Sequence, residues 1–65
     1  MLHAVIYRYV LHLESPECPR TLRWMFAHPV AEDDEIELPL FGRWHVRRVV
    51  TDEGLAGVLY CIPVG

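Results

Sequence analysis

The strongest pattern along the chain lies in residues 2–13, where hydrophobic residues occupy both alternating sets of positions. One set runs from His3 through two tyrosines to Leu13, and the other is interrupted by Arg8 and His12. β-Branched and aromatic residues dominate, and no Gly or Pro breaks the run. The segment therefore predicts a long strand with two apolar faces, of the kind that bends across a barrel or lies between two layers.

Residues 21–27 fit two kinds of secondary structure. Every second residue from Leu22 to Phe26 is hydrophobic, which is typical of a strand, but the spacing of Leu22, Met25 and Phe26 also fits one face of a helix. We favour a strand, because the segment is short for a helix and is rich in β-formers. The alternative is an α+β fold with a short helix at about residues 19–27.

The second half of the chain predicts strands joined by tight turns. Ile36, Leu38 and Leu40 alternate with polar residues, and the turn at 39–42 contains Pro and Gly. Trp44 and Val46 then share one face. The adjacent pair at 49–50 breaks the alternation, which indicates a β-bulge.

A second turn at residues 52–54 has the sequence Asp-Glu-Gly, with Gly54 at the position that tolerates a positive φ. Residues 55–62 alternate again and predict the last strand. Four or five short strands in 65 residues predict a single all-β domain over residues 1–65. We expect a small SH3-like barrel or an antiparallel meander.

Composition adds an expectation about association. Hydrophobic residues make up 52% of the chain, which is more than so small a core can enclose. The excess predicts an apolar surface that faces a second copy of the chain, as a homodimer, or an unidentified protein partner. Aromatic side chains are enriched at interface cores, and the candidate interface residues are Tyr9, Trp24 and Phe26.

The charge balance argues against a general nucleic-acid binder. The net charge is −3, and all six basic residues are arginines. The alternative function is nevertheless a small barrel that binds RNA or single-stranded DNA. It would use Arg43, Arg47 and Arg48 as a basic track, with nearby aromatic residues for base stacking.

Five of the six residues at 32–37 are acidic. In a hairpin, Glu35 and Glu37 would lie beside Arg43, His45 and Arg47, so we expect internal charge pairing on a solvated face. A calcium loop is disfavoured, because no Gly lies within the run and the ligand pattern of such loops is missing.

The sequence also predicts no metal site, no cofactor and no enzymatic activity. None of the four histidines has a His or Cys at zinc-ligand spacing. Cys18 and Cys61 form no C-x-x-C motif, and free thiols are favoured over a disulfide between them. The one serine, Ser15, precedes a proline, and no glycine-rich phosphate loop exists.

No run approaches the roughly 20 apolar residues that cross a bilayer, and the N-terminal segment lacks the basic start of a signal peptide. We therefore expect a cytoplasmic protein without a membrane partner. Taken together, the sequence predicts a small, non-enzymatic β-barrel that acts as a protein-interaction module and self-associates as a dimer.

Overall fold

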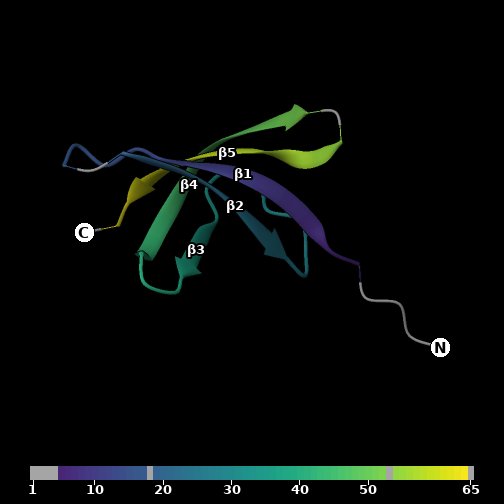
Figure 1. Ribbon diagram of the computed structural model, residues 1–65, viewed down its shortest axis with the longest axis horizontal. Helices are drawn as coiled ribbons and strands as arrows, with labels where there is room; N and C mark the ends of the chain where they lie inside the picture. Colours follow the sequence, from purple (N-terminus) through teal and green to yellow (C-terminus); the bar gives the residue numbers. More distant parts are fainter. Residues whose placement is uncertain (1–4, 18, 53, 65) are drawn as a thin grey trace.

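The computed structural model describes residues 5–17, 19–52 and 54–64. These residues form five strands and no helix, so none of them belongs to a helix that could span a membrane. The strands are β1 (Tyr7–Leu13), β2 (Arg20–Phe26), β3 (Glu35–Leu38), β4 (Gly42–Asp52) and β5 (Leu55–Pro63) (Figure 1). The predicted all-β fold is confirmed, and residues 20–26 are a strand rather than a helix.

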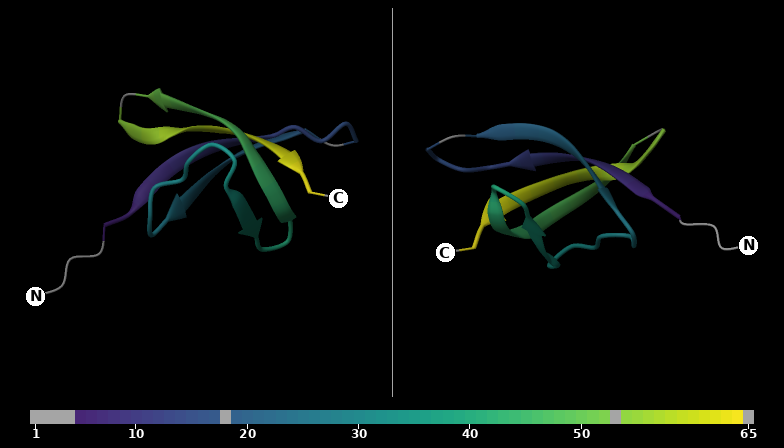
Figure 2. Two further views of the ribbon diagram at one scale, coloured as in Figure 1. Left: turned by 180° about the vertical axis from the view of Figure 1, so that it is seen from behind. Right: turned by 60° about the horizontal axis from the view of Figure 1, so that its bottom comes forward.

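All five strands belong to one sheet with the order β2-β1-β5-β4-β3. The neighbouring pairs are antiparallel except β1 and β5, which run parallel, so the chain order is not that of a plain meander. The sheet curls into a half-barrel whose two edge strands, β2 and β3, lie on the same side of the curl (Figure 2). The barrel-like shape matches the sequence prediction.

The first strand is shorter than the predicted strand over residues 2–13. It begins at Tyr7, while Val5 and Ile6 are exposed and lie outside the strand. Residues 2–4 lie outside the described part of the chain. The pairing with β2 explains this boundary, because the last partner available, opposite Tyr7, is Phe26. The sequence His28-Pro29 follows soon after and is unsuited to a continued strand.

The core fills the inner side of the curl. Every second residue of β1 from Tyr9 to Leu13 is buried, and the other strands add alternating positions in register. The predicted core position of Trp44 is confirmed: it is buried directly opposite Ile36, and its indole Nε1 donates to the carbonyl of Phe41 at 2.9 Å. The full buried set is Tyr9, Leu11, Leu13, Val30, Ile36, Leu38, Trp44, Val46, Leu59 and Cys61.

Both predicted turns are present. Leu40 and Gly42 have φ of 72° and 85° in the turn between β3 and β4, and Gly54 has φ of 79° before β5. The predicted bulge lies slightly earlier than expected, because the register with β5 shifts between Val46 and Arg48. The extra residue at 47 restores Val49 to the inner face, opposite Leu59.

Tyr9 connects the two halves of the sheet. Its hydroxyl accepts a hydrogen bond from the Val30 backbone N–H at 2.9 Å, and its ring packs edge-to-face on Phe26 at 5.8 Å between centroids. The residue opposite it on β5 is Gly57. A Cβ at this glycine would lie 2.9 Å from the Val50 carbonyl oxygen and 3.4 Å from the Tyr9 ring, so the tyrosine occupies space that a larger residue would fill.

Tyr9→Phe is expected to lower the free energy of unfolding by about 1–3 kcal/mol, because the buried Val30 N–H loses its acceptor. The measurement is urea denaturation at a fixed protein concentration. Tyr7→Phe is the matched control, since Tyr7 is only half-buried on the same face of β1. Equal stability of the two variants would contradict the structural role of the Tyr9 hydroxyl.

Candidate functional site

The three predicted interface residues lie side by side but differ in burial. Tyr9 is a core residue with 3% of its surface exposed, so its assignment to a surface available to partners is wrong. The sheet curls over the inner face of β1 and thereby buries the Tyr9 ring. Trp24 and Phe26 lie beside it on the same inner face of β2, but they are only half-buried because β2 is an edge strand.

The main-chain groups of β2 alternate between its neighbour and the open edge. The Glu14 N–H donates to the Cys61 carbonyl at 2.8 Å, so even-numbered residues of β1 point towards β5 and odd-numbered ones towards β2. In the observed register, the even-numbered residues of β2 point back to β1. The N–H and C=O groups of Thr21, Arg23 and Met25 therefore point away from the sheet, where no other described strand pairs with them.

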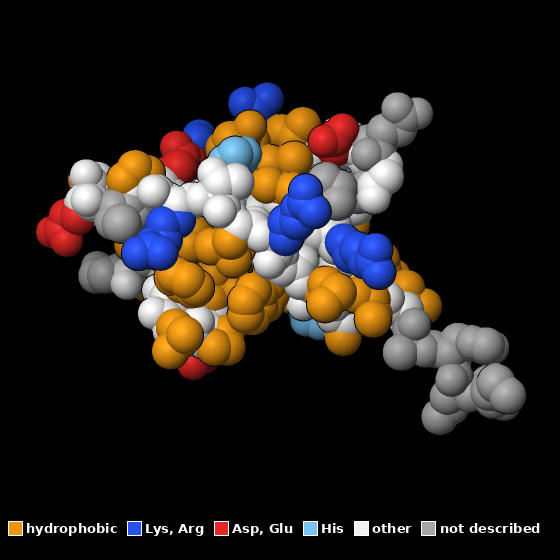
Figure 3. All heavy atoms as spheres, in the orientation of Figure 1, with side chains coloured by type: hydrophobic (Ala, Val, Ile, Leu, Met, Phe, Trp, Pro, Cys, Tyr) orange, Lys and Arg blue, Asp and Glu red, His pale blue; other side chains and the backbone are white. Residues whose placement is uncertain are grey.

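The open side of the half-barrel carries apolar side chains in addition to the unpaired main-chain groups of β2. Leu22, Trp24 and Phe26 pack against the core from β2 without being fully covered, and Leu40 is completely exposed beside β3. Figure 3 shows hydrophobic side chains gathered over β3 and the adjoining part of β2. The two edges approach each other at one point, where the Arg20 guanidinium lies 5.5 Å from the centre of the Phe41 ring.

The three arginines of the alternative nucleic-acid surface do not form one track. Arg47 donates to the Glu14 carboxylate from Nη2 at 2.8 Å and from Nε at 3.2 Å. Arg48 lies 6.0 Å from the centre of the Tyr60 ring. Arg43 is the cross-strand neighbour of Glu37. With Arg47 paired to a carboxylate, the charge of this set is reduced, which disfavours phosphate binding.

The predicted pairing of the acidic run with β4 is confirmed in part. Glu35 lies opposite His45, and Glu37 lies opposite Arg43. Arg47, predicted to join them, is instead the bulged residue and reaches Glu14.

The start of the acidic run forms a turn. The Asp34 carboxylate accepts from the Ala31 N–H at 2.9 Å, and Asp33 donates its own N–H to the Val46 carbonyl at 2.8 Å. The Asp33 carboxylate lies 3.4 Å from Nε2 of His45. Within residues 5–17, 19–52 and 54–64, no three His, Cys, Asp or Glu side chains gather as metal ligands would.

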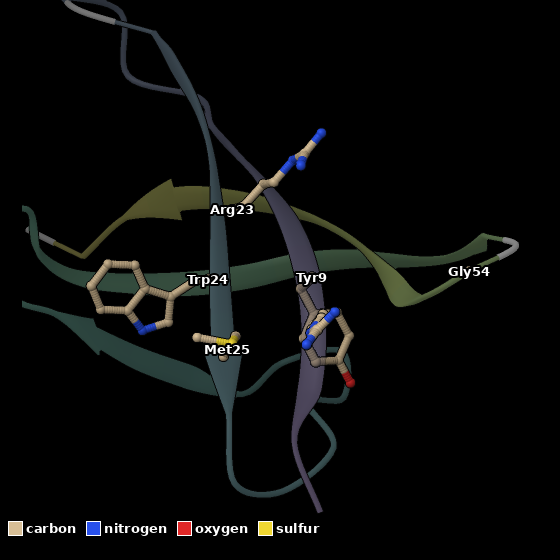
Figure 4. Close-up of a pocket in the computed structure, with 6 residues that line it drawn as sticks. Tyr9, Arg23, Trp24, Met25 and Gly54 are labelled. Carbon is tan, nitrogen blue, oxygen red and sulfur yellow. The ribbon is translucent and has the colours of Figure 1, made fainter.

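The outer face of the sheet carries polar and charged side chains. The His12 ring stacks on Tyr60 at 5.0 Å, and its Nδ1 lies 3.0 Å from the Thr21 hydroxyl. A hollow of about 560 Å³ opens over β1 and β2 (Figure 4). Sequence reasoning missed this feature, although Arg8 within an otherwise apolar run was a signal for it. Its lining residues are Arg8, Tyr9, Arg23, Trp24, Met25 and Gly54.

Cys61 is a packing residue. Its thiol is free and fully buried, and burial, followed by the nearby negative charge of Glu14, raises its pKa from 9.0 to about 11. The thiolate, which is the nucleophilic form, is therefore scarce near neutral pH. Cys18, the other cysteine of the sequence prediction, lies outside the described residues.

Comparisons with known proteins return no relative: no protein-family model, no curated protein and no solved structure matches the chain significantly.

Cys61 is expected to make stability fall with rising pH above 9. The unfolded thiol releases its proton near 9.0, whereas the folded thiol keeps it up to about 11. The unfolded state is therefore favoured increasingly across this interval, by about 2 kcal/mol at its upper end. Chemical denaturation across the interval tests this. Cys61→Ala should lose that part of the slope and Cys18→Ser should keep it; identical slopes for both variants would refute the assignment.

Proposed function

We propose that the chain is a small, non-enzymatic protein-interaction module that self-associates as a homodimer through the open edge of β2. The observation that carries this proposal is the coincidence of two features on one strand. The outward main-chain groups of Thr21, Arg23 and Met25 are available for a further strand. The inward side chains of Trp24 and Phe26 are half-buried and have apolar surface left to cover. A second strand at this edge satisfies both.

Side-chain chemistry favours an axis at Trp24 over one at Arg23 for pairing two β2 strands around a two-fold axis. An axis at Arg23 would place two arginines directly opposite each other, which is destabilising. An axis at Trp24 places the two indoles opposite each other and sets Leu22 against Phe26 of the second copy. In the same register, Arg23 faces Met25 of the second copy.

The main-chain geometry agrees with an axis at Trp24. Arg23 and Met25 both direct their N–H and C=O groups outward, so in this register they exchange hydrogen bonds between the copies. Trp24 then occupies a position without hydrogen bonds, where opposing side chains approach most closely. Aromatic pairs across strands contribute about 0.2–1 kcal/mol each.

The contact is small for a stable interface, since it consists of one strand and its inward side chains. We therefore expect a dissociation constant of about 1–100 μM. The dimer continues the sheet from one copy into the next and leaves the outer faces of both copies open.

Met25 allows a charge test of this register, because its side chain is 60% exposed in the single chain. Met25→Arg places two arginine pairs across the dimer and should weaken association by about tenfold or more. Met25→Glu places a carboxylate opposite each Arg23 and should strengthen association. Sedimentation equilibrium across a concentration series gives the dissociation constants.

The same two changes at Val5 serve as the control, because this side chain is also 60% exposed but lies outside the sheet. Val5→Arg and Val5→Glu should leave the dissociation constant unchanged. Equal effects at positions 5 and 25 would indicate a non-specific charge effect and contradict the proposed register. A wild-type chain that stays monomeric near millimolar concentration, or grows beyond a dimer, would contradict the dimer itself.

A further inference from the structure

The hollow on the outer face brings two arginines together. Arg8 lies opposite Met25 across the β1–β2 pair, and Val10 lies opposite Arg23. Arg8 and Arg23 are therefore diagonal neighbours on one face, with Cα atoms about 7–8 Å apart. Figure 4 shows Arg23 and Met25 on β2 with the turn at Gly54 on the far side of the hollow. The site is thus built from three separate segments of the chain.

Within the described part of the chain, the lining carries positive charge without a carboxylate: none of its six residues is acidic. Among the described residues, neither Arg8 nor Arg23 makes a salt bridge or a side-chain hydrogen bond, in contrast to Arg47. Two guanidinium groups that line one hollow repel each other, and an anion bound there would relieve this repulsion. Guanidinium groups suit carboxylate and phosphate oxygens, which they bind in a bidentate manner.

The rest of the lining is apolar. Met25 lies directly opposite Arg8 and two residues from Arg23 along β2, and its exposed side chain is the apolar group on this face. A volume of about 560 Å³ is within the usual range of small-molecule pockets, about 300–1,000 Å³. A small inorganic anion would leave most of this space empty. A ligand with an apolar body attached to its anionic group would fill it.

We propose that the hollow lined by Arg8, Arg23 and Met25 binds a small organic anion, in which a carboxylate or phosphate contacts the arginines and an apolar body lies against Met25. A nucleic acid is a poorer fit, because the chain has a net charge of −3 and only two free arginines line the hollow. All six lining residues belong to one chain, although Arg23 and Met25 also lie opposite each other between the two copies in the proposed β2 pairing.

Amide chemical shifts, followed by NMR during titration, test the proposal. The probes are 1-naphthoate and 1-naphthyl phosphate as anions with an apolar body, 1-naphthylmethanol as the neutral analogue, and inorganic phosphate as the anion alone. We expect saturable shifts at residues 8, 23–25 and 54 with one or both naphthyl anions. The neutral analogue and inorganic phosphate should each bind at least about tenfold more weakly. The stronger of the two naphthyl anions identifies the preferred anionic group.

Three arginine variants complete the test. Arg8→Gln and Arg23→Gln should each weaken binding of the naphthyl anion by about tenfold or more. Arg43→Gln, an exposed arginine outside the hollow, is the matched control and should leave binding unchanged. All three side chains are exposed, and an unchanged amide spectrum without ligand verifies folding.

Four results would overturn the proposal: no saturable shifts with either naphthyl anion, equal binding of the neutral analogue, equal binding of inorganic phosphate, or equal loss with Arg43→Gln. Tighter binding of a single-stranded oligonucleotide than of either naphthyl anion would also overturn it, in favour of a polyanion surface.

Discussion

The rest of this structure depends on the way Tyr9 is buried. Its ring occupies the space that Gly57 leaves open on β5 and packs against Phe26 on β2. Its hydroxyl accepts a hydrogen bond from the Val30 N–H in the segment leading to β3. One side chain therefore contacts three separate parts of the chain. Without it, the β1–β2 hairpin would be joined to the remaining strands mainly by the parallel pairing of β1 with β5.

The same burial fixes what the protein presents to solvent. Once odd-numbered residues of β1 face the core, the even-numbered ones, including Arg8, must face outward. The antiparallel register then places Arg23 and Met25 of β2 on that outer face. The position of these three residues on one face is thus a direct consequence of the packing on the opposite side of the sheet.

The features that the sequence predicts correctly are those with local causes. The alternation around Trp44, the turn at Gly54 and the short β3–β4 hairpin are all determined by residues within a few positions of one another. The parallel contact of β1 with β5 has no local signal, and it is this contact that leaves β2 at an edge. Tyr9 was assigned to the surface because aromatic enrichment does not distinguish cores from interfaces. The residue that decides its burial, Gly57, lies far away in the sequence.

The two edges of the half-barrel differ in a way that favours β2 for association. β3 has four residues, and only Glu35 and Glu37 direct main-chain groups outward, so two β3 edges would bring like charges together. Pairing β2 of one copy with β3 of another would match arginines with carboxylates, but such a head-to-tail contact repeats without closing unless its rotation happens to form a ring. The longer β2 can instead pair with itself, with Arg23 facing Met25 and every outward main-chain group near the axis satisfied. A two-fold contact of this kind uses the longer edge and closes after two copies. The acidic β3 edges stay exposed, and their like charges disfavour contact between dimers.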